Sequence, residues 1–200
     1  GHHLREIRRV PPHGPYHLLG WSFGGVVAHE IAVRLEQEGE EVRFLGLMDA
    51  YPVAGGPRTS VSYEEVLGMM LDAPEPPRVS DGRRGLLDRD AVVERLRRDD
   101  QVLAGFEESD VAALVDAAVN HVLIMSAFTP RLFQGDAVLF RAAREKAAHA
   151  PEVDLWSPHI SGHLKVHDID STHMGMTGPK PLSEIGRTIA QQIEPGKSPA

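Results

Sequence analysis

The sequence predicts an α/β fold in which a mostly parallel sheet is flanked by helices and interrupted by a helical insertion. Short apolar runs that suit buried strands alternate with segments of helical periodicity. The run at 42–48 is almost continuously apolar and follows a helical segment, as a parallel strand covered on both faces would. Between 55 and 134 this alternation stops, and only helix-type patterns remain.

Composition narrows the class of protein. With 200 residues, 42% of them hydrophobic, we expect one domain spanning 1–200 with an insertion at 55–134. The net charge of −8 argues against nucleic acid or an anionic membrane surface as partner. The absence of cysteine excludes disulfides, a thiol nucleophile and a cysteine zinc site, and we predict no metal site. No apolar run approaches a membrane span and no signal peptide is visible, so we expect a cytoplasmic protein.

The elements before the insertion follow from local patterns. A helix is predicted at 4–10, and prolines end it. A first strand is predicted at 16–19 and a helix at 26–38, followed by the strand at 42–48. Gly39 occupies the position of a helix C-cap glycine between these last two elements.

The insertion at 55–134 is predicted to contain helices and to act as a lid. Ser62, three residues before a glutamate, forms a capping-box pattern. Asp88 and Ser109 are predicted to cap two further helices, and Pro130 is expected to end the last one.

The carboxyl-terminal part resumes the alternation. We predict a strand at 137–141, a weak helix at 142–150 and a half-buried strand at 164–169. A loop at 170–175 follows. A closing amphipathic helix, with Pro181 in its first turn, is marked by Leu182, Ile185, Ile189 and Ile193.

The segment Gly20-Trp21-Ser22-Phe23-Gly24 has the pattern G-x-S-x-G between a predicted strand and a predicted helix. This is the context of a nucleophile elbow, in which a strained turn exposes a serine hydroxyl and small neighbours avoid clashes. Ser22 is therefore the candidate nucleophile. The N–H of Phe23, at the helix N-terminus, is a candidate oxyanion donor. We find no second donor in the sequence.

A serine nucleophile needs an imidazole base that a carboxylate orients. Ser22, Asp49 and His173 follow the chain order nucleophile, acid, base, and each comes just after a predicted strand. The carboxyl ends of parallel strands meet at one edge of a sheet, so these three are the predicted triad. Alternatives remain for both partners of the serine: Glu152 and Asp154 for the acid, and His149, His159 and His163 for the base.

Three segments carry a resemblance to a known family: 14–25 around the elbow, 28–32 in the next helix, and 47–52 around Asp49. They resemble the type I thioesterase domain that ends nonribosomal peptide synthetases, a member of the α/β-hydrolase superfamily. The interval of 27 residues between Ser22 and Asp49 is similar to that of the family, and the insertion falls where the family has its lid. The similarity extends loosely over nearly the whole chain.

The resemblance implies an activity. Such domains take a peptidyl or acyl chain from the phosphopantetheine arm of a peptidyl carrier protein, form an acyl-O-serine intermediate, and release it by hydrolysis or macrocyclisation. No other cofactor is implied. Ser22 would be the acylated nucleophile, His173 the general base and acid, Asp49 the orienting carboxylate and Phe23 an oxyanion donor. The residues expected to line an acyl pocket are Ala50, Phe106, Val122, Met125 and Phe128.

Two alternatives stay open. One is a free-standing type II editing thioesterase or a generic serine esterase, although an acid at the position of Asp49 favours the type I form. The other is a catalytically incomplete module that binds a carrier protein. The family has further strands before the first helix predicted here, so we expect an N-terminally incomplete fold with an exposed sheet edge.

Overall fold

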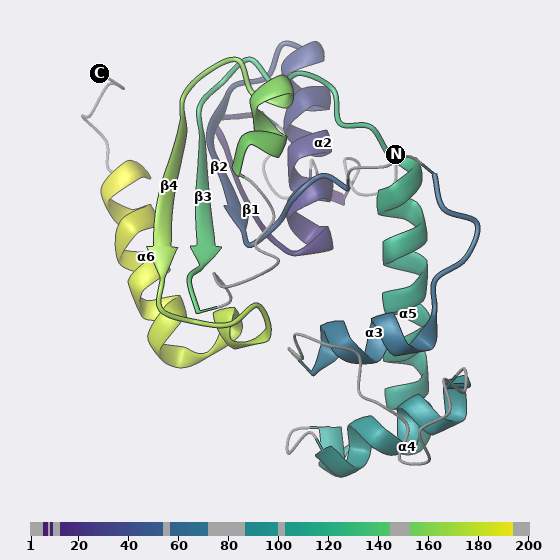
Figure 1. Ribbon diagram of the computed structural model, residues 1–200. Helices are drawn as coiled ribbons and strands as arrows, with labels where there is room; N and C mark the ends of the chain where they lie inside the picture. Colours follow the sequence, from purple (N-terminus) through teal and green to yellow (C-terminus); the bar gives the residue numbers. More distant parts are fainter. Residues whose placement is uncertain are drawn as a thin grey trace. The chain divides into compact units, whose positions relative to one another are not determined.

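The computed structural model describes residues 6–7, 9, 13–53, 57–71, 87–99, 103–144 and 153–193. The chain forms two compact units. One comprises Gly1–Pro52 with Thr129–Ala200 and contains the sheet, and the other, Val53–Phe128, is helical (Figure 1). The helical unit lies within the predicted insertion, and its role as a lid stays a prediction.

The sheet has four parallel strands in the order β1-β2-β3-β4, which confirms the predicted α/β class. The strands are β1 (Tyr16–Trp21), β2 (Val42–Met48), β3 (Ala137–Ala142) and β4 (Leu164–Ile169). Helix α2 (Phe23–Gln37) packs against β1 and β2, whereas α6 (Pro179–Ile193) lies on the other side of the sheet (Figure 1). Because the strands are parallel, all four carboxyl ends lie at one edge of the sheet.

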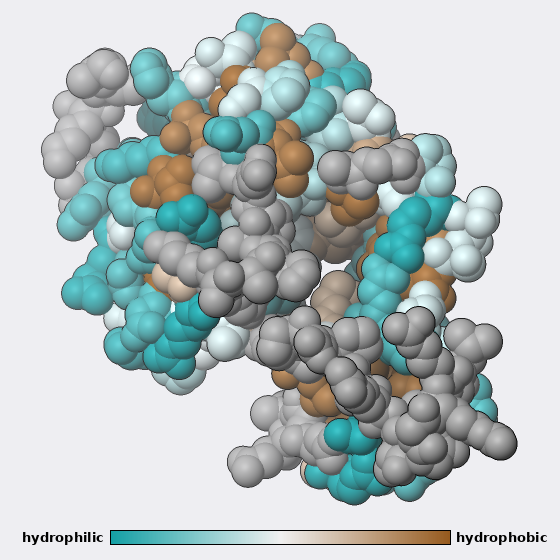
Figure 2. Space-filling model, in the orientation of Figure 1, coloured by the Kyte–Doolittle hydropathy of each residue, from teal (hydrophilic) through white to brown (hydrophobic). Residues whose placement is uncertain are grey.

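The core under α6 uses alternate residues of the strands. Phe44 and Met48 of β2, Phe140 of β3, Ile169 of β4 and Ile185 of α6 share one buried cluster. Since successive strand residues point to opposite faces, the buried Leu45 and Leu47 face away from α6. Hydrophilic residues occupy much of the visible surface of this unit, with apolar patches between them (Figure 2).

The side-chain pattern of β4 differs from the expectation. The alternation of Leu, Val and Ile with Lys, His and Asp predicts a half-buried strand, but Val166 is 37% exposed. Ile169 is buried in the cluster under α6, and His167 stacks on Phe140 at a ring-centroid distance of 5.8 Å. The strand period places Val166 on the face opposite His167 and Ile169, so the aliphatic residues cannot all point inward.

Strand β1 lies at one end of the strand order, and Leu19 in it is 45% exposed. Within the described residues β2 is its sheet neighbour, so the other edge of β1 has no pairing there. That further strands complete the sheet at this edge stays a prediction.

The helical unit contains α3 (Tyr63–Met70), α4 (Arg89–Asp99), the short 3-10 helix η1 (Leu103–Gly105) and α5 (Glu108–Ala127). Two predicted caps are present: the Ser62 hydroxyl accepts a hydrogen bond from Glu65 N at 3.2 Å, and the Asp88 carboxylate accepts one from Ala91 N at 2.9 Å. Its core comprises Val66, Leu67, Val92, Val93, Leu96, Val111, Ala112 and Val115.

The predicted cap at Ser109 is wrong. Helix α5 begins at Glu108, and the carbonyl of Glu107 already accepts hydrogen bonds from Asp110 N and Val111 N at 3.0 and 3.2 Å. Two acidic residues, Glu108 and Asp110, stand in the first turn, where the helix dipole favours negative charge. That electrostatic preference stabilises a start two residues earlier than the serine pattern indicates, with Glu107 in place of Ser109 as the N-cap.

Helix α5 also corrects the expectation that no segment reaches the length of a membrane span. Its 20 residues are long and apolar enough to cross a membrane by length and composition alone. This is weak evidence, because a core helix of a globular protein meets the same test. Val111, Ala112 and Val115 of this helix belong to the core of the helical unit.

Some predictions fall outside the described residues. Of the helix predicted at 4–10, the structure describes only 6, 7 and 9. Strand β3 continues through Ala142, so the helix predicted from that residue does not begin there, and 145–150 lies outside the described part. A short 3-10 helix that was not predicted, η2 (Val153–His159), precedes β4.

Candidate active site

Ser22 occupies a sharp turn between β1 and α2. Its backbone has φ 53° and ψ −127°, a strained conformation for a residue with a Cβ. Ser22 N donates to Met48 O at 2.9 Å, and Gly25 N donates to Ser22 O at 2.9 Å. The strand, strained serine and helix that a nucleophile elbow requires are therefore in place.

Two glycines make this turn possible, and one of them is not in the five-residue motif. A Cβ on Gly20 would lie 2.1 Å from Gly24 O, and one on Gly25 would lie 2.3 Å from the Cβ of Ala50. A Cβ on Gly24 would meet nothing within 4 Å. The interpretation that Gly24 relieves a clash is therefore wrong: Gly25 is the small residue that the packing after the serine requires.

We expect Gly25→Ala to lower the free energy of unfolding by about 1–3 kcal/mol, because the new methyl group overpacks against Ala50. Gly24→Ala is the matched control. It adds the same methyl in open space near the start of α2, where alanine favours the helix by about 0.5–1 kcal/mol. Urea unfolding of both variants measures the difference. Equal destabilisation by the two substitutions would contradict this steric assignment.

Asp49 follows β2 directly and has φ 44°, a second non-glycine residue in the left-handed region. Its carboxylate is 9% exposed, and its two oxygens have different partners. Oδ1 accepts hydrogen bonds from Ala142 N at 3.0 Å and from the Tyr51 hydroxyl at 3.2 Å. Oδ2 lies 2.7 Å from Nδ1 of His173. The acid is thus held by the last residue of β3 and by side chains from the loops after β2 and β4.

His173 links the acid to the serine. It follows β4 and precedes the 3-10 turn η3 (Met174–Thr177), and its Nε2 lies 3.0 Å from Ser22 Oγ. An ionised carboxylate can only accept, so we assign the proton of the neutral imidazole to Nδ1. Nε2 is then free to accept the hydroxyl proton of Ser22. The structure therefore brings all three predicted triad residues into hydrogen-bond contact.

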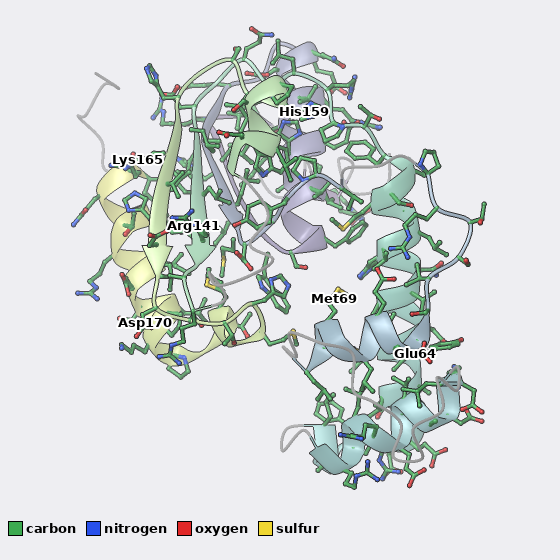
Figure 3. All side chains as sticks on the ribbon, viewed as in Figure 1. Glu64, Met69, Arg141, His159, Lys165 and Asp170 are labelled. Carbon is green, nitrogen blue, oxygen red and sulfur yellow. The ribbon has the colours of Figure 1, made fainter. Side chains whose placement is uncertain are left out.

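The alternatives are placed elsewhere. The side chain of His163 is 90% exposed and lies 3.5 Å from Asp136. His159 is the last residue of η2 and lies at one end of the sheet. Asp170, which directly follows the carboxyl end of β4, lies at the opposite end (Figure 3). Asp154 is exposed on η2. Glu152 and His149 lie outside the described residues.

The remaining predicted residues have these positions. Phe23 is the first residue of α2, next to Ser22, so its N–H lies at the positive end of the helix dipole. Ala50 is buried, and its carbonyl accepts a hydrogen bond from Trp156 Nε1 at 2.8 Å. The other predicted pocket residues, Phe106, Val122, Met125 and Phe128, belong to the helical unit and lie outside its buried cluster. Their roles stay predictions.

Sequence reasoning missed two side chains of this site. Burial raises the pKa of the Tyr51 hydroxyl, and the nearby charge of Asp49 raises it further. The hydroxyl therefore stays protonated and donates to Asp49. Trp21 donates its indole N–H to His173 O at 3.2 Å. Both aromatic residues adjoin motif residues, and that proximity is the signal that could have identified them.

Within the described part of the chain, no group of three or more metal-ligating side chains is placed to hold an ion.

His29, on α2, is fully buried beside Trp156, and its Nε2 donates to His159 O at 2.9 Å. Burial lowers its pKa from the ordinary value near 6.5. Burial also lowers the pKa values of His159 and His167. The unfolded chain therefore binds more protons than the folded chain as the pH falls below about 6.5.

We accordingly expect the free energy of unfolding to decrease between about pH 6.5 and pH 5, by up to about 1.4 kcal/mol per pH unit for each histidine that stays neutral when folded. His29→Gln should reduce this slope by up to about 1.4 kcal/mol per pH unit, because the amide keeps a donor but does not titrate. Urea unfolding at several pH values measures the slope. An unchanged slope in the variant would show that His29 protonates freely in the folded protein.

Comparisons with known proteins identify the family and the fold of the chain. A family model described as thioesterase domain matches residues 2–193. A dimodular nonribosomal peptide synthase of Bacillus subtilis (strain 168) is 38% identical over 194 residues, which are 96% of this chain but only 8% of the relative.

Two solved structures share the fold. A four-domain nonribosomal peptide synthetase, holo-AB3403 bound to AMP and glycine, has a TM-score of 0.74 at 19% identity, covering 96% of this chain and 15% of that one. The NocB thioesterase domain, in a covalent complex with a fluorophosphonate nocardicin G analogue, has a TM-score of 0.63 at 22% identity, covering 96% and 72%. Their likeness shows the fold of this chain, an α/β-hydrolase fold. The family model, which matches nearly the whole chain, shows that this chain belongs to the thioesterase domain family.

Proposed function

We propose that this chain releases a peptidyl or acyl group from the phosphopantetheine thioester of a carrier protein, through an ester on Ser22, by hydrolysis or macrocyclisation. The observation that carries the proposal is the continuous contact from Ser22 Oγ through His173 to Asp49, at 3.0 and 2.7 Å. Membership in the thioesterase family supports a thioester as the bond that is broken. The nonribosomal peptide synthases among the relatives support a carrier-bound peptide as the substrate.

The first half-reaction forms the acyl-enzyme. Ser22 Oγ attacks the thioester carbonyl carbon while its proton passes to Nε2 of His173. The negative charge that develops on the carbonyl oxygen is stabilised at the N-terminus of α2, where Phe23 supplies an N–H. The carbon–sulfur bond then breaks, and the departing pantetheine sulfur takes the proton from His173. Asp49 stabilises the imidazolium throughout this half-reaction.

The second half-reaction releases the product. Water, or a hydroxyl or amine of the acyl chain itself, gives a proton to His173 and attacks the ester carbonyl. When the tetrahedral intermediate collapses, Ser22 Oγ leaves and recovers the proton from His173. The product is an acid when water attacks, and a lactone or lactam when an internal hydroxyl or amine attacks. Exclusion of water would favour cyclisation, and the helical unit at 53–128 is our candidate for that lid.

The test is covalent labelling. The chain is treated with a fluorophosphonate and, separately, with an acyl-pantetheine thioester, and intact mass and peptide mapping locate the adduct. We expect one adduct, on Ser22, that Ser22→Ala abolishes. Ser161→Ala removes an exposed hydroxyl that bonds to Gln134 and should label normally. If neither reagent labels Ser22, the enzyme proposal for this chain is wrong.

A rate comparison then separates a thioesterase from a general esterase. The pantetheine thioester and the matching oxygen ester are compared by kcat/KM at equal acyl length. We expect preference for the thioester, and further preference when the acyl group is presented on a carrier protein. Equal rates for both free esters with no gain from the carrier would support the generic esterase alternative.

A further inference from the structure

We propose that Trp21 is a positioning residue for His173, one that holds the backbone and the ring of the histidine and favours its protonated form. This inference rests on the proposed acyl transfer at Ser22. Trp21 precedes the nucleophile directly, and it is a variable position of the G-x-S-x-G pattern. No step of the mechanism above uses its side chain.

One side chain makes two different contacts with the histidine. The indole Nε1–H donates to the backbone carbonyl of His173 at 3.2 Å. The indole ring also stacks on the imidazole, with ring centroids 5.3 Å apart and planes inclined by 30°. Trp21 therefore restrains both the loop that carries the histidine and the plane in which its two nitrogens lie.

Trp21 is anchored in the sheet. Trp21 is the last residue of β1, is paired with Met48 of β2, and packs against the buried cluster under α6. The loop that carries the histidine has hydrogen bonds of its own: the carbonyl of His173 accepts one from Met176 N at 3.3 Å, and Thr172 Oγ1 accepts one from Gly175 N at 3.1 Å. The indole N–H is a second donor on that same carbonyl. It ties the loop after β4 to the strand that presents the nucleophile.

Stacking also has an electrostatic consequence. When Nε2 takes the proton of Ser22, His173 becomes a cation, and the face of an indole ring attracts a cation within about 6 Å of its centroid. The neutral imidazole gains less from the same ring. Trp21 therefore stabilises the state in which the proton is on His173, which is the state that accompanies bond formation at Ser22.

Other charged groups at the carboxyl ends of the strands belong to several elements. The Asp49 carboxylate faces Nδ1, and Tyr51 donates to that carboxylate. Arg141 of β3 pairs with Asp168 of β4. Beyond β4, Asp170 pairs with Arg144 at 2.8 Å and lies 3.8 Å from Lys180. Replacing Trp21 removes none of these charged groups, so a change in pH dependence that is specific to the Trp21 variants reports the loss of the indole.

Two substitutions separate the two contacts. Trp21→Phe keeps a ring face and loses the N–H, whereas Trp21→Leu loses both. For each variant, the rate of acylation by an acyl-pantetheine thioester is measured by rapid mixing from pH 5 to 9. The rate is expressed per active site, titrated with a fluorophosphonate, so that inactive protein does not count.

We expect Trp21→Phe to lower the plateau rate about threefold to tenfold, in line with the loss of one neutral hydrogen bond. Its acid midpoint, the pH at which the rate is half its plateau, should stay close to that of the wild type. Trp21→Leu should lose about a further threefold, and its acid midpoint should move down by about half a pH unit because the imidazolium is less stable. The thioester concentration that gives half-maximal acylation should change less than twofold in both variants.

Phe44→Leu is the matched control, since Phe44 packs in the same buried cluster as Trp21. It should lower Tm and leave the acid midpoint of acylation unchanged. The inference is overturned if Trp21→Leu keeps the wild-type midpoint, or if Phe44→Leu moves it equally. If the wild type itself forms no acyl-enzyme, the proposed function fails, and that result is distinct from failure of the role of Trp21.

Discussion

Replacement of His173 by alanine is expected to lower the rate of Ser22 acylation by roughly 10⁵-fold, because the serine loses its only positioned base in the proposed mechanism. Nε2 of His173 lies 3.0 Å from Ser22 Oγ, within direct reach of the proton that must leave. Single-turnover acylation by an acyl-pantetheine thioester measures the loss. Circular dichroism and urea unfolding establish that the variant is folded.

His163→Ala is the matched control for this prediction. His163 is a rival base in the sequence, but its side chain is largely exposed and lies beside Asp136. Its removal should change the acylation rate less than twofold. A rate above about one hundredth of wild type in His173→Ala, or a large loss in His163→Ala, would contradict the assignment of the base.

The assembly of Ser22, Asp49 and His173 could be predicted from the sequence for a topological reason. Each residue comes shortly after a predicted strand, and the carboxyl ends of parallel strands share an edge of the sheet. Local pattern therefore sufficed to bring together residues 151 positions apart in the chain. No distance or rotamer had to be known for that step.

The packing behind the site could not be predicted in the same way. The demand for glycine at Gly25 comes from Ala50, which lies in the loop after β2. Trp156, fully buried, donates to the carbonyl of Ala50 from η2, a short 3-10 segment with no periodic signal. These contacts are tertiary, so a motif limited to neighbours along the chain contains no information about them.

The same limit explains the errors in the elements. A serine before an apolar helix predicts a cap at Ser109, but acidic residues on both sides make an earlier start favourable. In β4, hydrophobic residue types indicated an inward face, yet His167 and Ile169 share the side under α6 because that is where the closing helix packs. Residue type alone does not say which face of a strand is covered.

Asp49→Asn is expected to lower the acylation rate by about 10⁴-fold while leaving the fold intact. Asparagine tolerates the left-handed backbone at φ 44° as aspartate does, so the turn after β2 should be preserved. Ala142 N and the Tyr51 hydroxyl both donate at the Oδ1 position, so they select the carbonyl oxygen of the amide there. The NH₂ group is then directed at Nδ1 of His173.

An amide donor at Nδ1 places the imidazole proton on Nε2, which can then no longer accept the proton of Ser22. The loss should therefore appear in the plateau rate of acylation. The thioester concentration that gives half of that rate should be nearly unchanged. Asp154→Asn, at an exposed position on η2, should retain the wild-type rate. If Asp49→Asn kept the full rate and Asp154→Asn lost it, the orienting carboxylate would be Asp154, and the 2.7 Å contact between Asp49 and His173 would have no part in catalysis.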